Sequence, residues 1–341
     1  MKRPSIFFII MSVFLLVIFF AGLKELSLIG QSLQDGIWYF LILAGLFQFI
    51  FFAFQSEVRR SLYKILGIKE KFFSMLKMTF SAMFIGTVIP SFHMAALGLF
   101  MKEARTKGYS HSRALVASIG FIFLDTFGFF IALVFALFLL FRLGNLNIYQ
   151  LISSGVLFFA VLGGGVFVLY AMRREENIKK FFLKLSKFLP KKQRTRWLPD
   201  DEIEIMAKET IEAKKYFFER PQKLWKPFLF VGLTQIAGAL TLMCCFLAFG
   251  IPFTFTTIVV VYAMAILFQV VAITPYGLGS AEFFLTIILS NFGISLTRSL
   301  MLILVFRFFT FWIPMLAGYL LLRKIDKKSL VETKTKLNLR N

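Results

Sequence analysis

The sequence is poor in cysteine and histidine. Of its 341 residues, two are cysteines and two are histidines. Cys244 and Cys245 are adjacent in an apolar run and cannot form an ordinary disulfide with each other, so the chain has neither a disulfide framework nor a cysteine metal site. No HExxH motif, Walker loop or nucleophile elbow occurs, which leaves familiar hydrolase and ATPase chemistry without support. We therefore expect no metal and no other cofactor.

Negative charge is also scarce, and one long stretch carries no charge at all. The chain has 39 Lys and Arg against 18 Asp and Glu, and no charged residue or His occurs from Pro227 to Ala281. Hydrophobic residues make up 58% of the chain, more than a soluble domain of this length can bury. Several uncharged windows of about 20 residues are long enough to cross a hydrocarbon core of roughly 30 Å as helices. The sequence therefore predicts an integral membrane protein.

The excess of basic residues has an explanation that involves the membrane. The formal net charge of +21 would suggest nucleic acid as the partner of a soluble protein. Here the Lys and Arg residues lie in loops beside apolar spans, where they hold those loops on the cytoplasmic side next to anionic lipid. We expect membrane lipids with anionic headgroups as partners, and no nucleic acid.

Apolar segments predict an all-α polytopic membrane protein with about eight hydrophobic helical segments. Two of them, Met78 to Met101 and Pro252 to Asn291, are interrupted by Pro and Gly. The whole chain, residues 1–341, is predicted to be one integral membrane domain with a polar insertion at about residues 173–226. Six uninterrupted segments are predicted crossings: Pro4 to Leu23, Gly36 to Gln55, Ala114 to Phe141, Ile148 to Met172, Pro227 to Gly250 and Ser299 to Leu322.

Loop charge predicts the side on which each segment ends. The loops Glu57 to Lys71 and Lys102 to Arg113 are both basic and predicted to be cytoplasmic, so the interrupted segment between them must enter and leave on that side. The polar insertion and the C-terminal tail are basic too, which makes the second interrupted segment begin and end outside. The prediction is six crossings plus two re-entrant hairpins in an inner (plasma) membrane, with both termini cytoplasmic.

The two interrupted segments belong to a predicted internal repeat. One constant shift along the chain aligns GYSHSRAL at Gly108 with GISLTRSL at Gly293, and it also aligns Pro90 with Pro275. If the hairpins enter from opposite faces, the halves are related by an inverted pseudo-two-fold axis in the membrane plane, which is typical of transporters. The predicted repeat cores are about residues 74–141 and 252–322.

A helix that is interrupted inside a membrane needs a physical explanation. Backbone groups freed in hydrocarbon are costly unless protein or a water-filled cavity covers them. Pro275, Gly277 and Gly279 predict that a half-helix stops, that the chain turns, and that a new helix begins with its amides inside the membrane. Such a helix N-terminus attracts anions. Pro90 predicts a similar turn on the other side, and the nearby His93 is a candidate titrating residue there.

Charges within the predicted crossings are functional candidates. Arg307 lies about ten residues, or roughly 15 Å, into the last helix, and Asp125 lies at a similar depth in the matching helix. Each needs a partner or a wet cavity, because a charge at that depth costs at least about 2.5 kcal/mol. Two interpretations stay open. The two residues form an ion pair that joins the halves, or they bind substrate or control its passage.

Three further charged residues also have more than one interpretation. Glu282 is a candidate to cap the N-terminus of the second hairpin's helix or to pair with Arg307, and alternatively to couple protons. Arg113 and Arg298 occupy equivalent positions in the repeat, at the start of long helices. There they could snorkel to lipid headgroups or bind phosphate specifically.

The second hairpin resembles the signature of a known family. TPYGLGSAEFF, followed by a helix with a Gly-x-Ser start and an internal Arg, is similar to the flippase-like family that includes the transmembrane region of lysylphosphatidylglycerol synthases. Tyr276 replaces a Gly of that signature. The matching residues are Pro275, Gly277, Leu278, Gly279, Glu282, Gly293, Ser295 and Arg307.

The first half departs from the family pattern. Pro90 and Asp125 fit it. The turn and its Glu are replaced by Ser91, Phe92 and Leu97, and a Glu-Arg pair is replaced by Phe121 and Ile122. The resemblance therefore does not imply a mechanism that needs two chemically equivalent hairpins.

The resemblance implies a membrane protein with re-entrant helices that moves a phospholipid or an isoprenoid-linked lipid between leaflets. Our leading hypothesis is translocation of an anionic phospholipid or polyprenyl-linked lipid, with Arg307 and the half-helix N-termini holding phosphate. The alternatives are a membrane-embedded transferase that uses Asp125 and Glu282 as acid and base, and an accessory subunit that binds a lipid-synthesising enzyme through the polar insertion. Some family members carry a soluble aminoacyl-transferase domain, which we do not expect here because the sequence ends shortly after Leu322.

Overall fold

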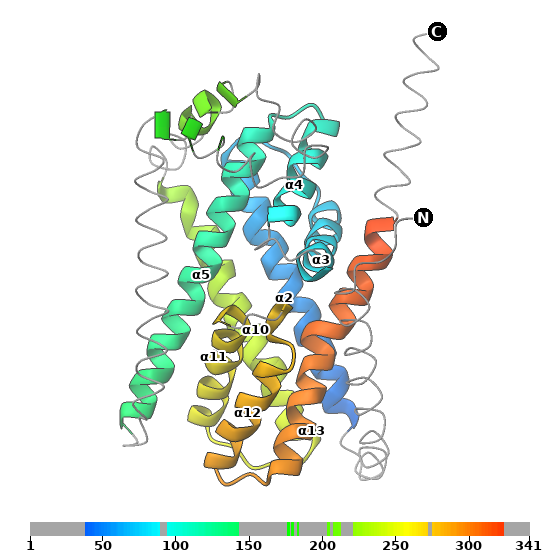
Figure 1. The fold of residues 1–341 in the computed structure, drawn as a ribbon, viewed down its shortest axis with the longest axis vertical. Helices are drawn as coiled ribbons and strands as arrows, with labels where there is room; N and C mark the ends of the chain where they lie inside the picture. Colours follow the sequence, from blue (N-terminus) through cyan, green and yellow to red (C-terminus); the bar gives the residue numbers. More distant parts are fainter. Residues whose placement is uncertain are drawn as a thin grey trace.

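The computed structural model describes residues 38–88, 94–142, 221–271 and 275–323, together with a few helical residues between 176 and 212. Within these ranges the regular structure is helical, and the chain is an all-α polytopic membrane protein (Figure 1). The elements are α2 (Trp38–Ile65), α3 (Phe72–Val88), α4 (Met94–Thr106), α5 (His111–Arg142), η2 (Pro221–Leu224), α10 (Trp225–Ala248), α11 (Phe255–Val271), η3 (Pro275–Gly277), α12 (Ser280–Asn291), α13 (Leu296–Arg307) and the π-helix η4 (Phe308–Trp312).

Four helices in the described ranges are long and apolar enough to cross a membrane. They are Trp38–Ile65, His111–Arg142, Gln222–Ala248 and Leu296–Arg323, the last of which combines α13, η4 and a further helical stretch. Each coincides with a predicted crossing, so these four predictions are confirmed. The other two predicted crossings, Pro4 to Leu23 and Ile148 to Met172, lie outside the described residues.

Both interrupted segments form pairs of shorter helices, as predicted. α11 ends at Val271 and α12 begins at Ser280, with the short η3 helix between them. α3 ends at Val88 and α4 begins at Met94. Pro90 and His93 lie outside the described residues.

The helix α2 is longer than the predicted crossing. The sequence pattern placed residues 57–65 in a loop, but they continue α2 to Ile65. Within this extension Arg60 forms an ion pair with Glu57 one turn earlier and donates a hydrogen bond from Nε to the Glu70 carbonyl oxygen at 3.2 Å. The loop prediction was wrong here because charged residues mark the depth at which a helix meets polar surroundings, and the helix itself continues past that depth.

The helices of the two halves correspond under the shift that places Gly108 on Gly293. The same shift places the end of α4 on the end of α12, and the first residue of α5 on the first residue of α13. Gly108 and Gly293 themselves have φ angles of +78° and +81°. After each of them the same backbone hydrogen bond closes the preceding helix, from Tyr109 to Ala104 at 3.0 Å and from Ile294 to Leu289 at 3.3 Å. The correspondence extends to α2 and α10, which pack against each other.

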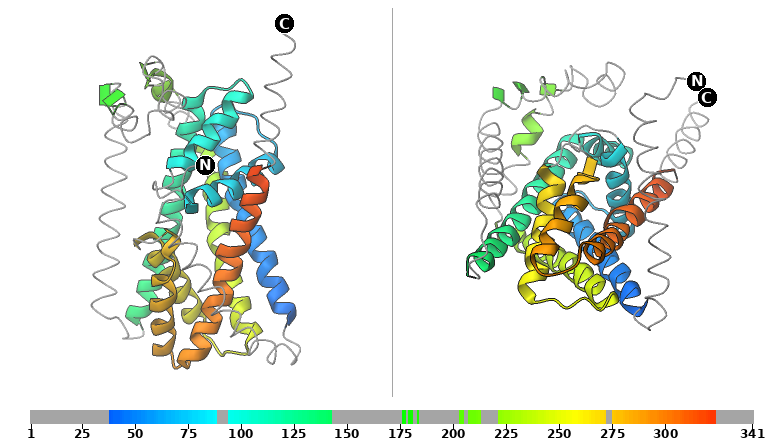
Figure 2. Two further views of the ribbon diagram at one scale, coloured as in Figure 1. Left: turned by 45° about the vertical axis from the view of Figure 1, so that its right-hand side comes forward. Right: turned by 60° about the horizontal axis from the view of Figure 1, so that its bottom comes forward.

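The two hairpins occupy opposite ends of the bundle. Figures 1 and 2 show α4 near one end and α11 with α12 near the other, with the long helices running between them. Lys107, in the loop after α4, donates a hydrogen bond to Glu70 in the loop before α3 at 2.6 Å, so both ends of the first hairpin meet at one end of the bundle. The described helices therefore have the opposed arrangement that the inverted repeat requires.

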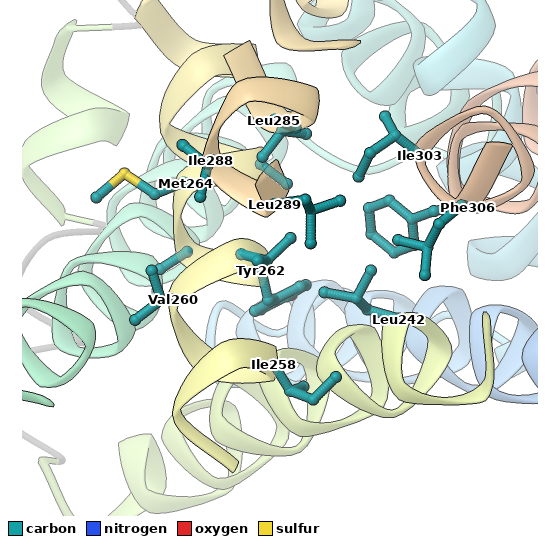
Figure 3. Packing of buried hydrophobic residues seen from close by; sticks show 14 of the residues in the cluster. Leu242, Ile258, Val260, Tyr262, Met264, Leu285, Ile288, Leu289, Ile303 and Phe306 are labelled. Carbon is teal, nitrogen blue, oxygen red and sulfur yellow. The ribbon is translucent and has the colours of Figure 1, made fainter. Parts of the chain in front are cut away.

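An apolar core joins the helices of the second half. Leu242 of α10, Tyr262 of α11, Leu289 of α12 and Phe306 of α13 are all buried in it (Figure 3). Gly238 lets α10 and α11 approach closely, because a Cβ atom at that position would collide with the Tyr262 ring. The tight packing fixes α12 and α13 side by side, which positions the polar residues described below.

Candidate functional site

The turn of the second hairpin has a backbone that few residues adopt. Tyr276, Gly277 and Gly279 have φ angles of +52°, +70° and +84°. A Cβ atom at Gly277 would lie 3.0 Å from both the Gln269 Cα and the Phe268 carbonyl oxygen. The turn thus presses against the end of α11, which explains a glycine at this position. Tyr276 stands where the resembling family has a Gly, and it holds a left-handed conformation that costs a non-glycine residue energy.

Glu282 occupies the N-terminus of α12. The Gly279 backbone N–H donates a hydrogen bond to Glu282 Oε2 at 2.7 Å, which is the arrangement of a capping residue in the first turn of a helix. The residue is 9% exposed. The half-helix N-terminus that the sequence offered to a substrate anion is therefore already filled by a carboxylate of the chain itself.

Arg307 fastens this turn to the last long helix. Its Nε donates a hydrogen bond to Glu282 Oε1 at 2.6 Å, and its Nη2 donates one to the Tyr276 carbonyl oxygen at 2.7 Å. The Arg307 side chain is 2% exposed, and its Cζ lies 5.4 Å from the centroid of the Phe311 ring. A buried Arg with a carboxylate and a carbonyl as partners acts as a brace between α13 and the turn.

The π-helix η4 begins immediately after Arg307. Single π-turns inside α-helices are often found at functional sites. Here the irregular turn lies between the brace and Pro314, which has no N–H to donate to the helix. The last long helix is therefore irregular directly beside the second hairpin's turn.

Asp125 has a different neighbour from the one that the sequence suggested. Arg307 pairs with Glu282, and among the described residues no ion pair joins Asp125 to Arg307. The cation that acts electrostatically on Asp125 is Arg59 of α2, and both act on Tyr276 at the second turn. The charges of the first half therefore interact with the turn of the second half.

Sequence reasoning missed Arg59 because it counted this residue among the cations of a loop. Arg59 lies in the last two turns of α2, and its Cζ is 3.4 Å from the centroid of the Phe121 ring and 5.4 Å from that of Phe100. Its Nη1 atom is buried and has no hydrogen-bond partner among the described residues. The available signal was the helical spacing of Arg59 from the buried Phe52 and Ser56, which places it partly on the inner side of α2.

The remaining predicted site residues lie apart. Arg113 is in the first turn of α5 and Arg298 in the first turn of α13, at opposite ends of the bundle (Figure 1). Arg298 is exposed, and Arg113 is partly buried near the loop before α3. Neither contributes to the arrangement around Glu282 and Arg307.

A separate apolar cavity of about 450 Å³ lies between α2, α3 and the last long helix. Phe52, Leu76 and Phe80 are among its lining residues, and none of the predicted site residues lines it. Gln48 lines it as well, and its Oε1 is buried without a hydrogen-bond partner in the described ranges. In those ranges no group of three or more His, Cys, Asp or Glu side chains is arranged to hold a metal ion.

The sequence matches the family described as the lysylphosphatidylglycerol synthase transmembrane region over residues 6–318. The chain belongs to this family. It is similar to the UPF0104 membrane protein of Methanocaldococcus jannaschii, with 25% identity over 305 residues that cover 85% of this chain and 87% of the relative. The family membership agrees with the resemblance seen in the second hairpin, and with the spanning helices it identifies a multi-pass membrane protein.

Proposed function

We propose that this member of the family moves a lipid with an anionic headgroup between the two leaflets of the membrane. The observation that carries the proposal is the position of charge between the halves. Asp125 lies well inside the long apolar helix His111–Arg142, and it interacts electrostatically with Arg59 of α2 and with Tyr276 of the second turn. Charges at such depth are retained for function as a rule, because hydrocarbon offers them no compensation.

The arrangement of the hairpins supports the same proposal. Two interrupted helix pairs that enter from opposite ends are the construction that transporters use for a central site. A lipid headgroup needs such a polar path, whereas its acyl chains can stay in the bilayer. The phosphate or other anionic group of the lipid would meet Arg59, and Arg307 would serve as the brace of the second turn.

A transferase role has weaker support. It requires Glu282 as an acid or base, but both carboxylate oxygens accept hydrogen bonds, one from Gly279 N–H and one from Arg307 Nε. Both oxygens of Glu282 thus already have partners within the chain, at the helix N-terminus and at the brace. The geometry therefore favours movement of an unchanged lipid.

Lipid movement is tested directly in vesicles. The purified protein is reconstituted with fluorescent phosphatidylglycerol, phosphatidylethanolamine, phosphatidylcholine or a polyprenyl phosphate, and dithionite quenching measures how fast each label reaches the other leaflet. We expect faster movement of at least one anionic lipid than in protein-free vesicles, with no change in the lipid's covalent structure on mass analysis. If no lipid of the panel moves faster, the proposed function is wrong.

We further propose that the protein lies in the plasma membrane with both termini and the first hairpin's open end on the cytoplasmic side. Thr106 and Thr297 are exposed and lie at the end of α4 and at the start of α13, respectively. With Cys244 and Cys245, which are buried, replaced by Ala, single Thr106→Cys and Thr297→Cys variants can be probed with a membrane-impermeant maleimide. We expect Thr297→Cys to react in intact cells and Thr106→Cys to react only after lysis. Labelling of both variants from the same side would contradict the opposed hairpins.

A further inference from the structure

Arg59 is a partly buried cation, and its Nη1 atom is buried without a hydrogen-bond partner among the described residues. A guanidinium group has five N–H donors and is charged at any physiological pH. Among the described residues no carboxylate lies within ion-pair distance of Arg59, and none accepts a hydrogen bond from it. A buried polar group without partners calls for an explanation such as an ion or ligand at the site.

The two other Arg side chains nearby show what a satisfied guanidinium looks like in this protein. Arg60, the next residue of α2, pairs with Glu57 and bonds the Glu70 carbonyl oxygen. Arg307 pairs with Glu282 and bonds the Tyr276 carbonyl oxygen. Arg59 has no such partners in the described ranges, although it is the one of the three that acts on Asp125.

Aromatic rings hold the Arg59 guanidinium in place instead. Its Cζ lies 3.4 Å from the centroid of the Phe121 ring of α5, and Phe100 of α4 is close as well. Stacking on an aromatic face orients the plane of a guanidinium and leaves its N–H groups directed outward along their edges. A planar fork fixed in this way is suited to two parallel hydrogen bonds from a tetrahedral oxyanion.

We propose that Arg59 binds a phosphate group, with its stacked guanidinium donating two hydrogen bonds to the phosphate oxygens. This inference rests on the proposed function for the source of the phosphate, which is the headgroup of a phospholipid. Asp125 is the neighbouring carboxylate that acts on the same cation. Its negative charge weakens the hold of Arg59 on a bound phosphate, so that the headgroup can leave again.

The test is the stabilisation that a ligand gives to the folded protein. Purified wild-type protein in detergent is heated with added phosphatidylglycerol, with diacylglycerol, which has the same chains but no phosphate, or with inorganic phosphate. We expect phosphatidylglycerol to raise the midpoint of thermal unfolding by about 3 °C or more and diacylglycerol to leave it unchanged. Arg59→Gln should lose most of the shift, and Arg59→Lys should keep part of it because the charge remains.

Arg60→Gln is the matched control, since it removes the same charge one residue away from a guanidinium that already has protein partners. It should keep the shift given by phosphatidylglycerol. If Arg59→Gln keeps the full shift, or if diacylglycerol shifts the wild type equally, the phosphate site is wrong. If inorganic phosphate alone reproduces the shift in an Arg59-dependent manner, the phosphate site stands and the lipid as its source is contradicted.

If Arg59→Gln does not fold, the remaining variants still decide the matter. Asp125→Asn removes the carboxylate that acts on Arg59, so it should increase the phosphatidylglycerol shift. If phosphatidylglycerol raised the unfolding midpoint of Asp125→Asn by less than that of the wild type, the proposal that Asp125 and the phosphate compete for Arg59 would be contradicted. A purely structural Arg59, which only packs α2 against α5, predicts no change in that shift.

Discussion

The two re-entrant hairpins are held at different places. The second hairpin is fastened at its turn, where Arg307 joins Glu282 and the Tyr276 carbonyl oxygen. The first hairpin is fastened at its open end, where Lys107 contacts Glu70 at 2.6 Å and Glu103 at 3.1 Å. Residues of the polar insertion also hold the open end of the first hairpin. Ser110 donates a hydrogen bond to Glu209, and Ala207 packs against α4 and α5.

The internal repeat explains why the first hairpin has no equivalent brace. Leu97 and Ile122 stand at the positions that correspond to Glu282 and Arg307. Leu97 is buried among apolar side chains and Ile122 is 42% exposed, so neither can form an ion pair. Asp125 corresponds to Thr310 in the second half. One half therefore uses its buried charges to hold a turn, and the other half retains charges that are not paired with each other at close range.

This difference suggests a division of roles between the halves. A brace of two buried, mutually satisfied charges adds rigidity, and breaking one member leaves an uncompensated charge. Charges without close partners are available to a ligand. We infer that the second half provides a fixed wall and that the first half, with Arg59 and Asp125, provides the groups that meet the lipid.

The largest loss of stability is expected when one member of the brace between Arg307 and Glu282 is removed. Arg307→Ile or Glu282→Leu alone should lower the stability of the folded protein by about 3–5 kcal/mol, because the remaining charge is buried without its partner. The double variant Glu282→Leu/Arg307→Ile installs the residues of the first half and should recover much of this loss. Thermal unfolding in detergent measures all three. A double variant no more stable than the weaker single variant would show that the pair does not act as a unit.

A smaller effect is expected at the open end of the first hairpin. Burial acts to lower the pKa of Lys107, but its hydrogen bond to Glu70 and the charges of Glu70 and Glu103 outweigh burial and hold the pKa above its ordinary value. Because the folded-state pKa is the higher one, the contribution to stability is complete at neutral pH and is lost as the pH rises above the range in which lysine titrates.

Lys107→Met should therefore cost about 1 kcal/mol or less at neutral pH, since the side chain is partly exposed and solvent screens the pair. The loss should shrink as salt is added. Lys69→Met is a suitable control, because Lys69 is exposed in the same region and forms no ion pair in the described ranges. A loss as large as that of Arg307→Ile would contradict the contrast between the two hairpins.

The sequence predicted the fold better than it predicted the site. Uncharged runs and the internal repeat were sufficient for the four described crossings and for the break at Pro275, because both follow from composition and local backbone chemistry. The partner of Arg307 was left open between Asp125 and Glu282. Which carboxylate lies within reach depends on how α12 packs on α13, and no single-sequence pattern encodes that distance.

The role of Arg59 could not be predicted from loop charge. Loop charge is an average over a segment, so it assigned the cations around residue 59 to one cytoplasmic loop. The structure separates two adjacent residues of that segment, since Arg60 pairs with Glu57 and Arg59 stacks on Phe121. Neighbouring residues of a helix point about 100° apart, and only the packed neighbours reveal which one faces inward.

The most direct test of the division of roles compares two variants in the vesicle assay, at a temperature at which both are folded. Asp125→Asn should slow the movement of the best-transported anionic lipid by about tenfold or more, because it removes the group that opposes tight binding at Arg59. The double variant Glu282→Leu/Arg307→Ile should keep at least about half of the wild-type rate, because its lost charges only hold the turn. The reverse result, with the double variant inactive and Asp125→Asn unimpaired, would contradict the account.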